Sequence, residues 1–255
     1  MFFLPWFIQY LFKARIYSKV LNSKSSKQTQ QLYRYLFKKK KDKMRKLLLL
    51  TAVILPLPLK LFIYRFFGWN IGKNVKIGFS YIDSNLVNIG NGVEIGSFNI
   101  IKGLSFFEIG DNSCIKNFNQ FFFSGNKAES PVWSGKITFG EKVNVMSHHF
   151  IDAGGSINIG KNTTIAGRDT HIWSHGFILV DSKKVKQRYQ VNVGTNVYLG
   201  ARTTVLGSSI PDRAMVGAGS IVNKSFPAEN YPLLIAGNPA KIKKRYEFSN
   251  DHKTP

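Results

Sequence analysis

Residues 70–101 read NIGKNVKIGFSYIDSNLVNIGNGVEIGSFNII, and an aliphatic residue recurs there at every sixth position, usually followed by glycine, with only position 83 skipped. A period of six matches neither an α-helix nor a simple alternating strand. It suits a short strand, a sharp corner and another short strand, with the aliphatic side chain pointing inward. Glycine and asparagine supply the tight backbone that the corners require. Three such sides close a triangular coil, and successive coils stack at the usual strand spacing.

The repeat continues through most of the chain. Its later inward positions are Ile109, Ile115, Phe139, Val145, Ile151, Ile159, Ile165, Val193, Leu199, Val205, Ile210, Val216 and Val222. No coil buries a core by itself, so many coils are needed and both ends have to be capped. The pattern therefore predicts an all-β solenoid.

This repeat resembles the hexapeptide repeat of the left-handed parallel β-helix acyltransferases, over roughly residues 70–245. The resemblance implies a left-handed parallel β-helix with an N-terminal helical appendage and a short C-terminal helix. The expected segments are an appendage at 1–69, the β-helix domain at 70–237 with loops at 117–136 and 176–190, and a C-terminal cap and tail at 238–255. An unrelated β-solenoid is the alternative fold.

Positive charge is concentrated in the appendage. The 255-residue chain has a formal charge of +22, and residues 1–76 hold 17 Lys and Arg against one acid, or +16, which leaves +6 for residues 77–255. Cys114 is the only cysteine, so an intrachain disulfide is excluded and a reducing, cytoplasmic location fits. The apolar first twelve residues lack both a preceding basic region and a small-residue cleavage site, so a secretory signal is not expected.

Two apolar stretches, Met1–Phe12 and Leu47–Trp69, flank the basic run KKKKDKMRK at residues 38–46. The second stretch is uninterrupted by charge only from Leu47 to Leu59, which is short of the about 20 apolar residues that a membrane span needs, and Pro56 and Pro58 are expected to break a helix there. Basic clusters beside apolar segments favour contact of residues 1–69 with the inner membrane surface. A helical cap with a solvated charge run is the alternative. Nucleic-acid binding is not expected, because no zinc pattern, recognition-helix motif or RNA-binding aromatic signature accompanies the charge.

His175 follows the regular hexads in HIWSHGF, residues 171–177, and the repeat then breaks until Val191. A loop extruded from a regular coil is where a solenoid places function. The arrangement resembles the galactoside, maltose and polysaccharide O-acetyltransferases, in which a loop separates a histidine from a segment like VNVGTNVYLGA, residues 191–201. The resemblance implies that His175 is the catalytic base, which deprotonates a sugar hydroxyl as it attacks acetyl-CoA. A surface histidine at a loop edge is the structural alternative.

Asp152 lies about one coil before His175, so it is a candidate to hold the imidazole ring or to contact the acceptor; a plain corner aspartate is the alternative. His148, His149 and Trp173 are candidate acceptor contacts. His171 is expected to point inward or to stack, because it replaces an aliphatic residue of the repeat.

The excursion at residues 117–136 is rich in aromatic residues, including Phe121–Phe123 and Trp133. It suits either a stacking platform for a sugar ring or a contact between subunits.

A metal site is not expected. His171 and His175 would stand about 13 Å apart on a strand, so one chain cannot easily use both as ligands. Zinc shared between subunits, as in the γ-class carbonic anhydrases, is the remaining metal alternative.

The C-terminal part reads VGAGSIVNK at residues 216–224 and AGNPAKIKKR at residues 236–245. These segments closely resemble the ending of sugar and polysaccharide O-acetyltransferases. The resemblance implies a homotrimer with a CoA groove between subunits. The residues expected to line it are Tyr198, Ala201, Ala218, Asn223 and Lys224. The cations of residues 241–245 suit either CoA phosphates or a solvated tail.

Taken together, these features predict an acetyl-CoA-dependent O-acetyltransferase that modifies a sugar hydroxyl of a surface polysaccharide (capsule, O-antigen or exopolysaccharide) or its precursor. An N-acyltransferase acting on an amino or nucleotide sugar is one alternative. A non-catalytic solenoid that binds a ligand is another.

Overall fold

The computed structural model describes residues 42–123, 125 and 130–246. The chain divides into two compact units, Met1–Leu48 and Leu49–Pro255, and the second contains all the coils. In the first unit, residues 42–48 are helical. The predictions for Met1–Phe12 and for residues 38–41 of the basic run lie outside the described residues.

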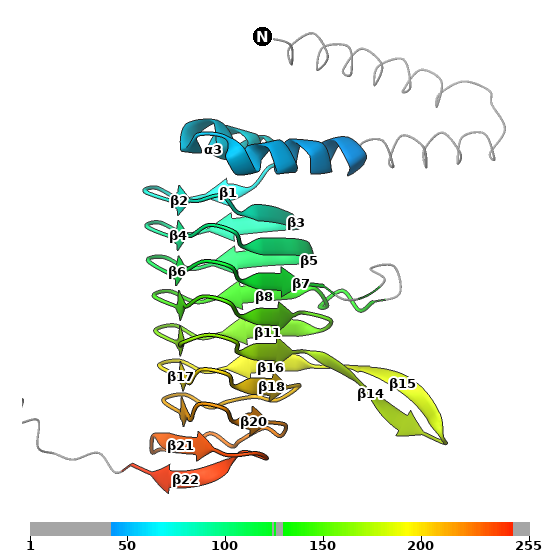
Figure 1. Cartoon of the computed structure of the whole chain (residues 1–255). Helices are drawn as coiled ribbons and strands as arrows, with labels where there is room; N and C mark the ends of the chain where they lie inside the picture. Colours follow the sequence, from blue (N-terminus) through cyan, green and yellow to red (C-terminus); the bar gives the residue numbers. More distant parts are fainter. Residues whose placement is uncertain (1–41, 124, 126–129, 247–255) are drawn as a thin grey trace, which may run out of the picture. The chain divides into compact units, whose positions relative to one another are not determined.

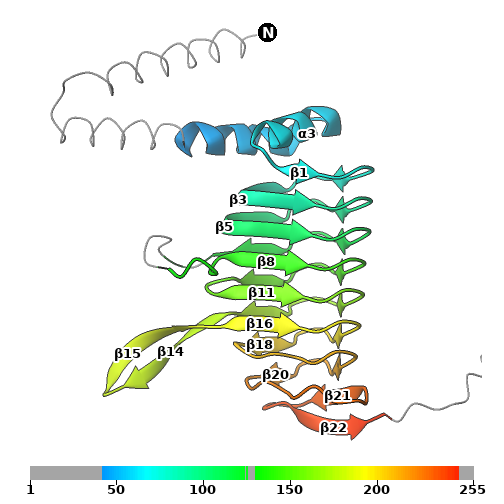
Figure 2. The same ribbon diagram turned by 180° about the vertical axis from the view of Figure 1, so that it is seen from behind.

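The second unit is a coil of β-strands, in which the chain visits three stacks of parallel strands in turn (Figure 1). The first stack, seen in order in Figure 2, contains β1 (Asn70–Ile71), the ends of β3 (Tyr81–Ile89) and β5 (Ile100–Ile109), β8 (Lys136–Phe139), β11 (Ser156–Ile159) and β16 (Gln190–Val193). The second contains β2 (Lys76–Ile77), β4 (Glu94–Ile95), β6 (Cys114–Ile115), β9 (Asn144–Val145), β12 (Thr164–Ile165), β17 (Tyr198–Leu199), β19 (Met215–Val216) and β21 (Leu233–Ala236). The third contains the beginnings of β3 and β5, then β7 (Gln120–Phe122), β10 (Phe150–Asp152), β13 (His171–Trp173), β18 (Thr204–Leu206) and β20 (Ile221–Val222).

The core lies inside the coil, where the repeat predicted it. Every inward position assigned from Ile71 to Val222 is buried, with an exposed fraction of at most 8%. Equivalent residues stack from coil to coil, as Ile77 does on Ile95 and Ile95 on Ile115. Burial of each such side chain contributes about 1.5–3 kcal/mol. The prediction of an all-β fold of coiled parallel strands is confirmed.

Two corners differ in length from the simple repeat. The corner before Ile82 is one residue shorter than six-residue spacing requires, and the corner before Ile172 is one residue longer. Ile82 and Ile172 therefore occupy inward positions of the third stack. The skipped position 83 is thereby explained. The expectation that His171 occupies an inward position is wrong, since its side chain is exposed beside the buried Ile172.

A ladder of buried polar side chains closes one corner of successive coils. Ser80 Oγ accepts a hydrogen bond from the backbone N–H of Asn99, and the amide oxygen of Asn99 accepts one from the N–H of Asn119. The amide oxygen of Asn119 in turn accepts a hydrogen bond from the N–H of His149, and His149 Nδ1 accepts one from the N–H of Thr170 at 3.1 Å. These contacts satisfy amides that no strand partner reaches.

Helices precede the first coil. Residues 42–54 are helical, the chain breaks at Pro56 as predicted, and α3 (Leu57–Phe66) follows with a proline in its first turn. Lys60 on α3 is buried, and its Nζ donates to the carbonyl oxygens of Ile77 (3.2 Å) and Gly78 (2.6 Å). Among the described residues, none of the helices has both the length and the apolar character needed to cross a bilayer.

The C-terminal end contradicts the predicted short helix. Residues after the turn at Gly237 form β22 (Lys241–Arg245), which pairs antiparallel with β21. Ile242 lies opposite the buried Ile235, so an antiparallel strand covers the last coil where a helix was expected. The pairing satisfies backbone groups that an open edge would leave exposed.

Candidate functional site

A β-hairpin leaves the coil where the repeat breaks. It consists of β14 (His175–Val180) and β15 (Lys183–Arg188), and its first cross-strand pair is His175 with Arg188. Tyr189 donates its N–H to the carbonyl of Ser174, which returns the chain to the coil beside its point of departure. The segment predicted as a loop at 176–190 is therefore mainly an ordered hairpin, and His175 lies at its root.

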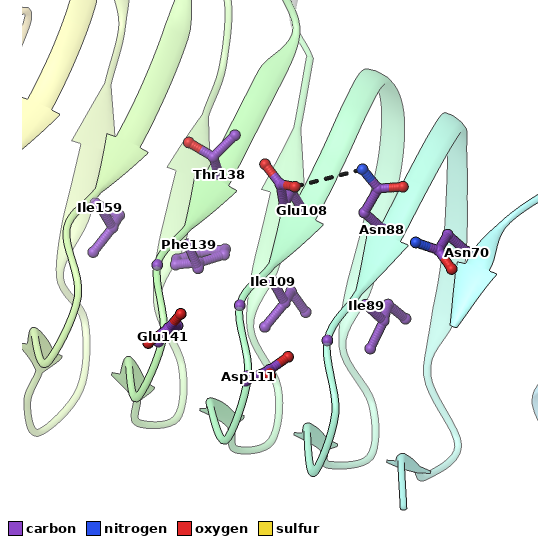
Figure 3. A pocket seen from close by; sticks show the side chains of 13 residues that line it. Asn70, Asn88, Ile89, Glu108, Ile109, Asp111, Thr138, Phe139, Glu141 and Ile159 are labelled. Atoms are coloured by element: carbon purple, nitrogen blue, oxygen red, sulfur yellow. Dashed lines mark hydrogen bonds between the residues drawn. The ribbon is translucent and has the colours of Figure 1, made fainter. Parts of the chain in front are cut away.

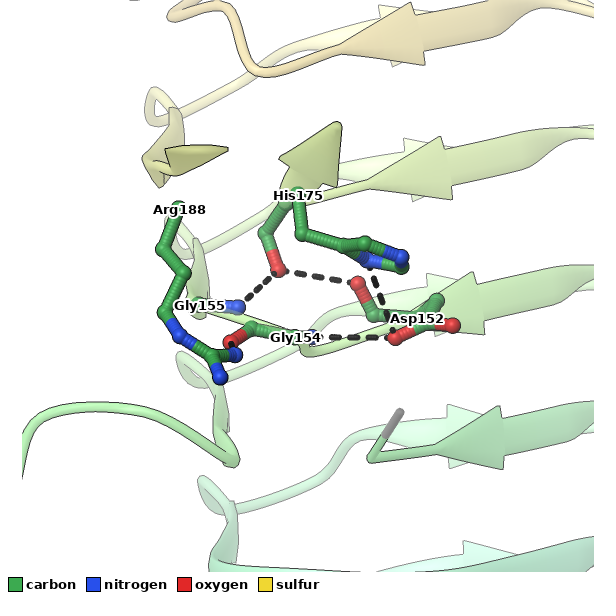
Figure 4. A network of polar contacts seen from close by, with 6 residues as sticks. Asp152, Gly154, Gly155, His175 and Arg188 are labelled. Carbon is green, nitrogen blue, oxygen red and sulfur yellow. Dashed lines mark hydrogen bonds and ion pairs between the residues drawn. The ribbon is translucent and has the colours of Figure 1, made fainter. Parts of the chain in front are cut away.

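His175 faces Asp152 of the preceding coil (Figure 4). Its Nδ1 is 3.5 Å from Oδ1 of Asp152, and the two side chains are 15% and 2% exposed. This separation is long for a hydrogen bond, although such contacts in unliganded sites often shorten when substrate binds. Nδ1 is buried, while the second ring nitrogen points away from Asp152 (Figure 4). Counting the residues of one coil in the sequence had predicted that Asp152 lies near His175.

Two glycines support this pair. The N–H of Gly154 donates to Oδ1 of Asp152 at 2.9 Å, which orients the carboxylate. A Cβ at Gly154 would lie 2.5 Å from His175 Nδ1, so no larger residue fits beneath the ring. The N–H of Gly155 donates to Ser174 Oγ, and Arg188 donates to the carbonyl of Gly154. A glycine pair in a strand region signals close approach of another segment, and this signal was not used in the prediction from the sequence.

The surroundings of His175 keep its imidazole neutral. Burial lowers the pKa of His175, the Asp152 carboxylate opposes this, and the positive charges of Lys186 and Arg188 lower the pKa further. The net direction is downward from the ordinary value of about 6.5. A neutral ring with one nitrogen turned toward a carboxylate and the other turned outward has the properties of a general base.

Aromatic rings line the approach to His175. The ring centroid of Trp173 lies 6.1 Å from that of His175 and 4.9 Å from that of Phe150. Phe150 and Trp173 border a shallow concavity of about 440 Å³, which is also lined by His148, His149 and His171. His148 stacks on Phe118, and His171 meets Phe150 and Trp173 edge-on, so the stacking part of its prediction agrees with the structure. Trp173 and His148 thus line one concavity, and the Trp173 ring is next to His175.

His149 has mainly a structural position. Its side chain is 1% exposed and belongs to the polar ladder, where its Nδ1 accepts from Thr170. Burial lowers the pKa of His149 to about 4. His149 is among the residues that line the concavity beside Trp173, but its buried side chain mainly closes a corner, as Asn99 and Asn119 do.

The five predicted CoA contacts fall into two groups. Tyr198, Ala201 and Ala218 lie along the second stack, where the N–H of Gly219 donates to the carbonyl of Ala201. Asn223 and Lys224 follow β20 in the third stack, two coils beyond Trp173. Both of these residues are exposed, and Lys224 Nζ lies 5.7 Å from the ring centroid of Phe226.

The cations of β22 differ in availability. Arg245 forms two short contacts with Glu229, at 2.6 and 2.8 Å. This pairing favours a structural role for Arg245, whereas Lys241, Lys243 and Lys244 form no ion pair with another residue that the structure describes.

Two further concavities lie on the first stack, away from His175. One of about 510 Å³ includes Trp133 and Phe106, and the other, of about 480 Å³, is polar and includes a hydrogen bond from Asn88 to Glu108 (Figure 3). The predicted platform Phe121–Phe123 is split, because Phe121 is a core residue. Among the described residues, no cluster of three or more His, Cys, Asp or Glu is arranged to hold a metal ion.

Comparison with known proteins places these features in a family. No family model matches the chain. WbbJ of Escherichia coli (strain K12), assigned to lipopolysaccharide biosynthesis as an O-acetyl transferase, is 33% identical over 145 residues, which cover 51% of this chain and 71% of WbbJ. The chain belongs to the hexapeptide-repeat acyltransferase family. YvoF of Bacillus subtilis (strain 168), assigned as an acetyltransferase, is 37% identical over 87 residues, covering 34% of this chain and 46% of YvoF.

Among solved structures, AntD, an N-acyltransferase from Bacillus cereus, aligns at 18% identity over 70% of this chain and 84% of its own, with a TM-score of 0.44. The predicted family and its acyltransferase activity are confirmed by the WbbJ match. The roles of individual residues in this acyltransferase rest on geometry and are treated as proposals below.

Proposed function

We propose that the protein transfers an acetyl group from acetyl-CoA to a hydroxyl of a sugar, within a surface polysaccharide or its precursor. The observation that carries the proposal is the imidazole of His175, held at the hairpin root against the buried Asp152. The kinship to WbbJ, which is assigned to lipopolysaccharide biosynthesis, favours a glycan acceptor.

In the proposed reaction, the outward nitrogen of His175 accepts the proton of the acceptor hydroxyl while the hydroxyl oxygen attacks the thioester carbonyl. The carbon–sulfur bond then breaks, the acetyl group leaves as an ester of the acceptor, and the proton on His175 passes to the departing CoA thiolate. Asp152 positions the ring and stabilises its transient positive charge. The downward shift of the His175 pKa keeps the base unprotonated at neutral pH.

The acceptor is proposed to bind in the concavity beside Trp173. The rings of Phe150 and Trp173 offer apolar surface for the face of a sugar, and His148 and His171 offer polar edges. A sugar hydroxyl placed over this surface lies next to His175, because the Trp173 and His175 rings are 6.1 Å apart.

For acetyl-CoA we propose a groove between two subunits of a homotrimer with a left-handed coil. Tyr198, Ala201 and Ala218 would line one side of it, and Asn223 and Lys224 the other. The two groups occupy different stacks of one chain, and apposition of two copies would bring them together. The small residues leave room for the pantetheine arm beside exposed backbone, and Lys224 supplies charge for a phosphate.

The proposal is tested by incubating the full chain with labelled acetyl-CoA and fragments of capsule and lipopolysaccharide. The expected product is an acetyl ester, which mild base cleaves. A base-stable amide would assign the enzyme to the N-acyltransferases, and a chain that binds no CoA would contradict the transferase function altogether.

We also propose that the enzyme works in the cytoplasm, at the inner face of the membrane where lipid-linked glycan precursors are built. The basic character of residues 1–76 supports this location.

A further inference from the structure

Helix α3 has one buried side and one exposed, apolar side. One side carries Lys60 and Tyr64, which are buried within the coil unit. The other carries Leu59, Phe62 and Phe66, which are 54%, 70% and 57% exposed. Their spacing of three and four residues places them along one stripe of the helix. A surface helix normally carries polar side chains on its outer side, so we expect this apolar stripe to contact an apolar partner.

The helical residues before α3 also carry exposed apolar side chains. Leu50 and Ile54 are one helical turn apart and are 59% and 75% exposed. Ala52 and Leu49, on the same segment, are buried. Two consecutive helical segments of the coil unit therefore each present large apolar side chains to solvent.

In the sequence, the segments that flank this surface carry charge of almost one sign. The sequence contains no acidic residue between Asp42 and Asp83, and Arg65 is exposed in the last turn of α3. The first 48 residues contain thirteen Lys and Arg and a single Asp. Apolar side chains accompanied by cations alone are complementary to a bilayer with anionic headgroups.

We propose that this surface binds the membrane. The apolar helix face, as we name it, consists of Leu50, Ile54, Leu59, Phe62 and Phe66. These side chains enter the boundary between headgroups and acyl chains, while the exposed Arg65 contacts the anionic headgroups. A ten-residue helix is about 15 Å long, about half of the hydrocarbon thickness, so α3 lies in the bilayer surface. Under the proposed function, this contact holds the site close to a lipid-linked acceptor.

The test is sedimentation of the full chain with two kinds of vesicles, pure phosphatidylcholine and phosphatidylcholine mixed in equal parts with phosphatidylglycerol. The wild-type chain is expected to bind the anionic vesicles more tightly. The variant Leu59→Ser/Phe62→Ser is expected to bind them at least about tenfold more weakly, because two membrane-inserted side chains are lost. Leu86→Ser/Phe98→Ser is the matched control, since it changes the same residue types at comparably exposed positions on the coils.

Equal binding by the wild-type chain and the Leu59→Ser/Phe62→Ser variant would overturn the proposal. Light scattering of both chains without vesicles identifies the other occupants: a lower oligomer mass in the variant would assign the face to a contact between copies. Acetyl transfer to a soluble acceptor without vesicles is expected to be unchanged in the variant. Loss of membrane binding and loss of the proposed catalytic function are thereby distinguished.

Discussion

His149 and His175 lie on consecutive coils of the third stack, and the structure uses them in opposite ways. His149 sits in a regular corner, where it continues the ladder of Asn99 and Asn119 and is shielded from solvent. His175 sits where the coil opens into a hairpin, with one ring nitrogen toward Asp152 and the other outward. Burial lowers the pKa of both histidines. The comparison shows that the state of the corner, closed or open, decides whether a neutral imidazole serves structure or is available for chemistry.

The largest expected difference between the two positions is catalytic. His175→Ala removes the proposed base, and we expect kcat to fall by about 10²–10⁴-fold, the usual contribution of general-base catalysis. Asp152→Asn should give a smaller loss, because the base remains but loses the charge that stabilises it. Transfer from labelled acetyl-CoA measures both variants. Wild-type rates in the His175→Ala chain would show that another group is the base.

The second prediction concerns acid stability. The folded state holds His149 with a pKa of about 4, against about 6.5 when unfolded, so the unfolded chain binds the extra proton between these values. The contribution of His149 is present above pH 6.5 and is lost as the pH falls toward 4, by about 3 kcal/mol in all. Denaturant unfolding between pH 7 and pH 4 measures the change.

His149→Asn is the matched variant, because asparagine occupies the equivalent corner at Asn119 and Asn99. This variant should keep its acetyltransferase activity and show a flatter dependence of unfolding free energy on pH. An unchanged acid dependence would mean that other groups cause the loss of stability.

The third prediction probes the close approach beneath His175. Gly154→Ala places a Cβ 2.5 Å from Nδ1, so the ring must shift. A displacement of about 1 Å at a catalytic group can lower the rate by about 10²-fold. Gly176→Ala is the control, because its Cβ would meet no atom nearer than 3.8 Å. Similar kcat values for the two variants would argue against a tightly positioned ring.

The smallest effect is expected from the charge on the hairpin. Lys186 lowers the pKa of His175, so Lys186→Gln should raise it. The rate constant kcat/KM rises with pH as His175 loses its proton, and this rise should move to higher pH in the variant. Lys184→Gln, farther along the same strand, is the control. Identical pH profiles for the wild-type chain and Lys186→Gln would remove His175 as the titrating group.

Prediction from the sequence was strongest where one local rule was repeated. Inward positions such as Ile95 and Val145 were found because the same short spacing recurs coil after coil. It failed where a corner gained or lost a residue, as before Ile82 and Ile172, because the repeat contains no signal for corner length. The tail was misassigned for a related reason. Ile242 forms part of a strand only because the last coil offers it an edge and an apolar neighbour.

The candidate site was also predicted only in part from the sequence. The break in the repeat identified His175, and counting coils suggested Asp152. The sequence did not predict the distance between these two residues, the support from Gly154 or the position of the Arg188 cation. All three depend on contacts between residues 21–34 positions apart. Sequence alone also could not separate His148 from His149, because a one-residue step decides which side chain faces the core.

By itself, the sequence determined that this protein is a stack of short strands with an aliphatic core, an interruption marked by a histidine, and a basic, apolar N-terminal segment. Those features are periodic or compositional, and a local pattern suffices to produce them. The tertiary structure decided which histidine is buried, how a carboxylate and an imidazole meet across coils, and which sides of α3 remain uncovered. Each of these depends on corner lengths and on neighbours supplied by another coil, so the position of a residue along the chain cannot specify them.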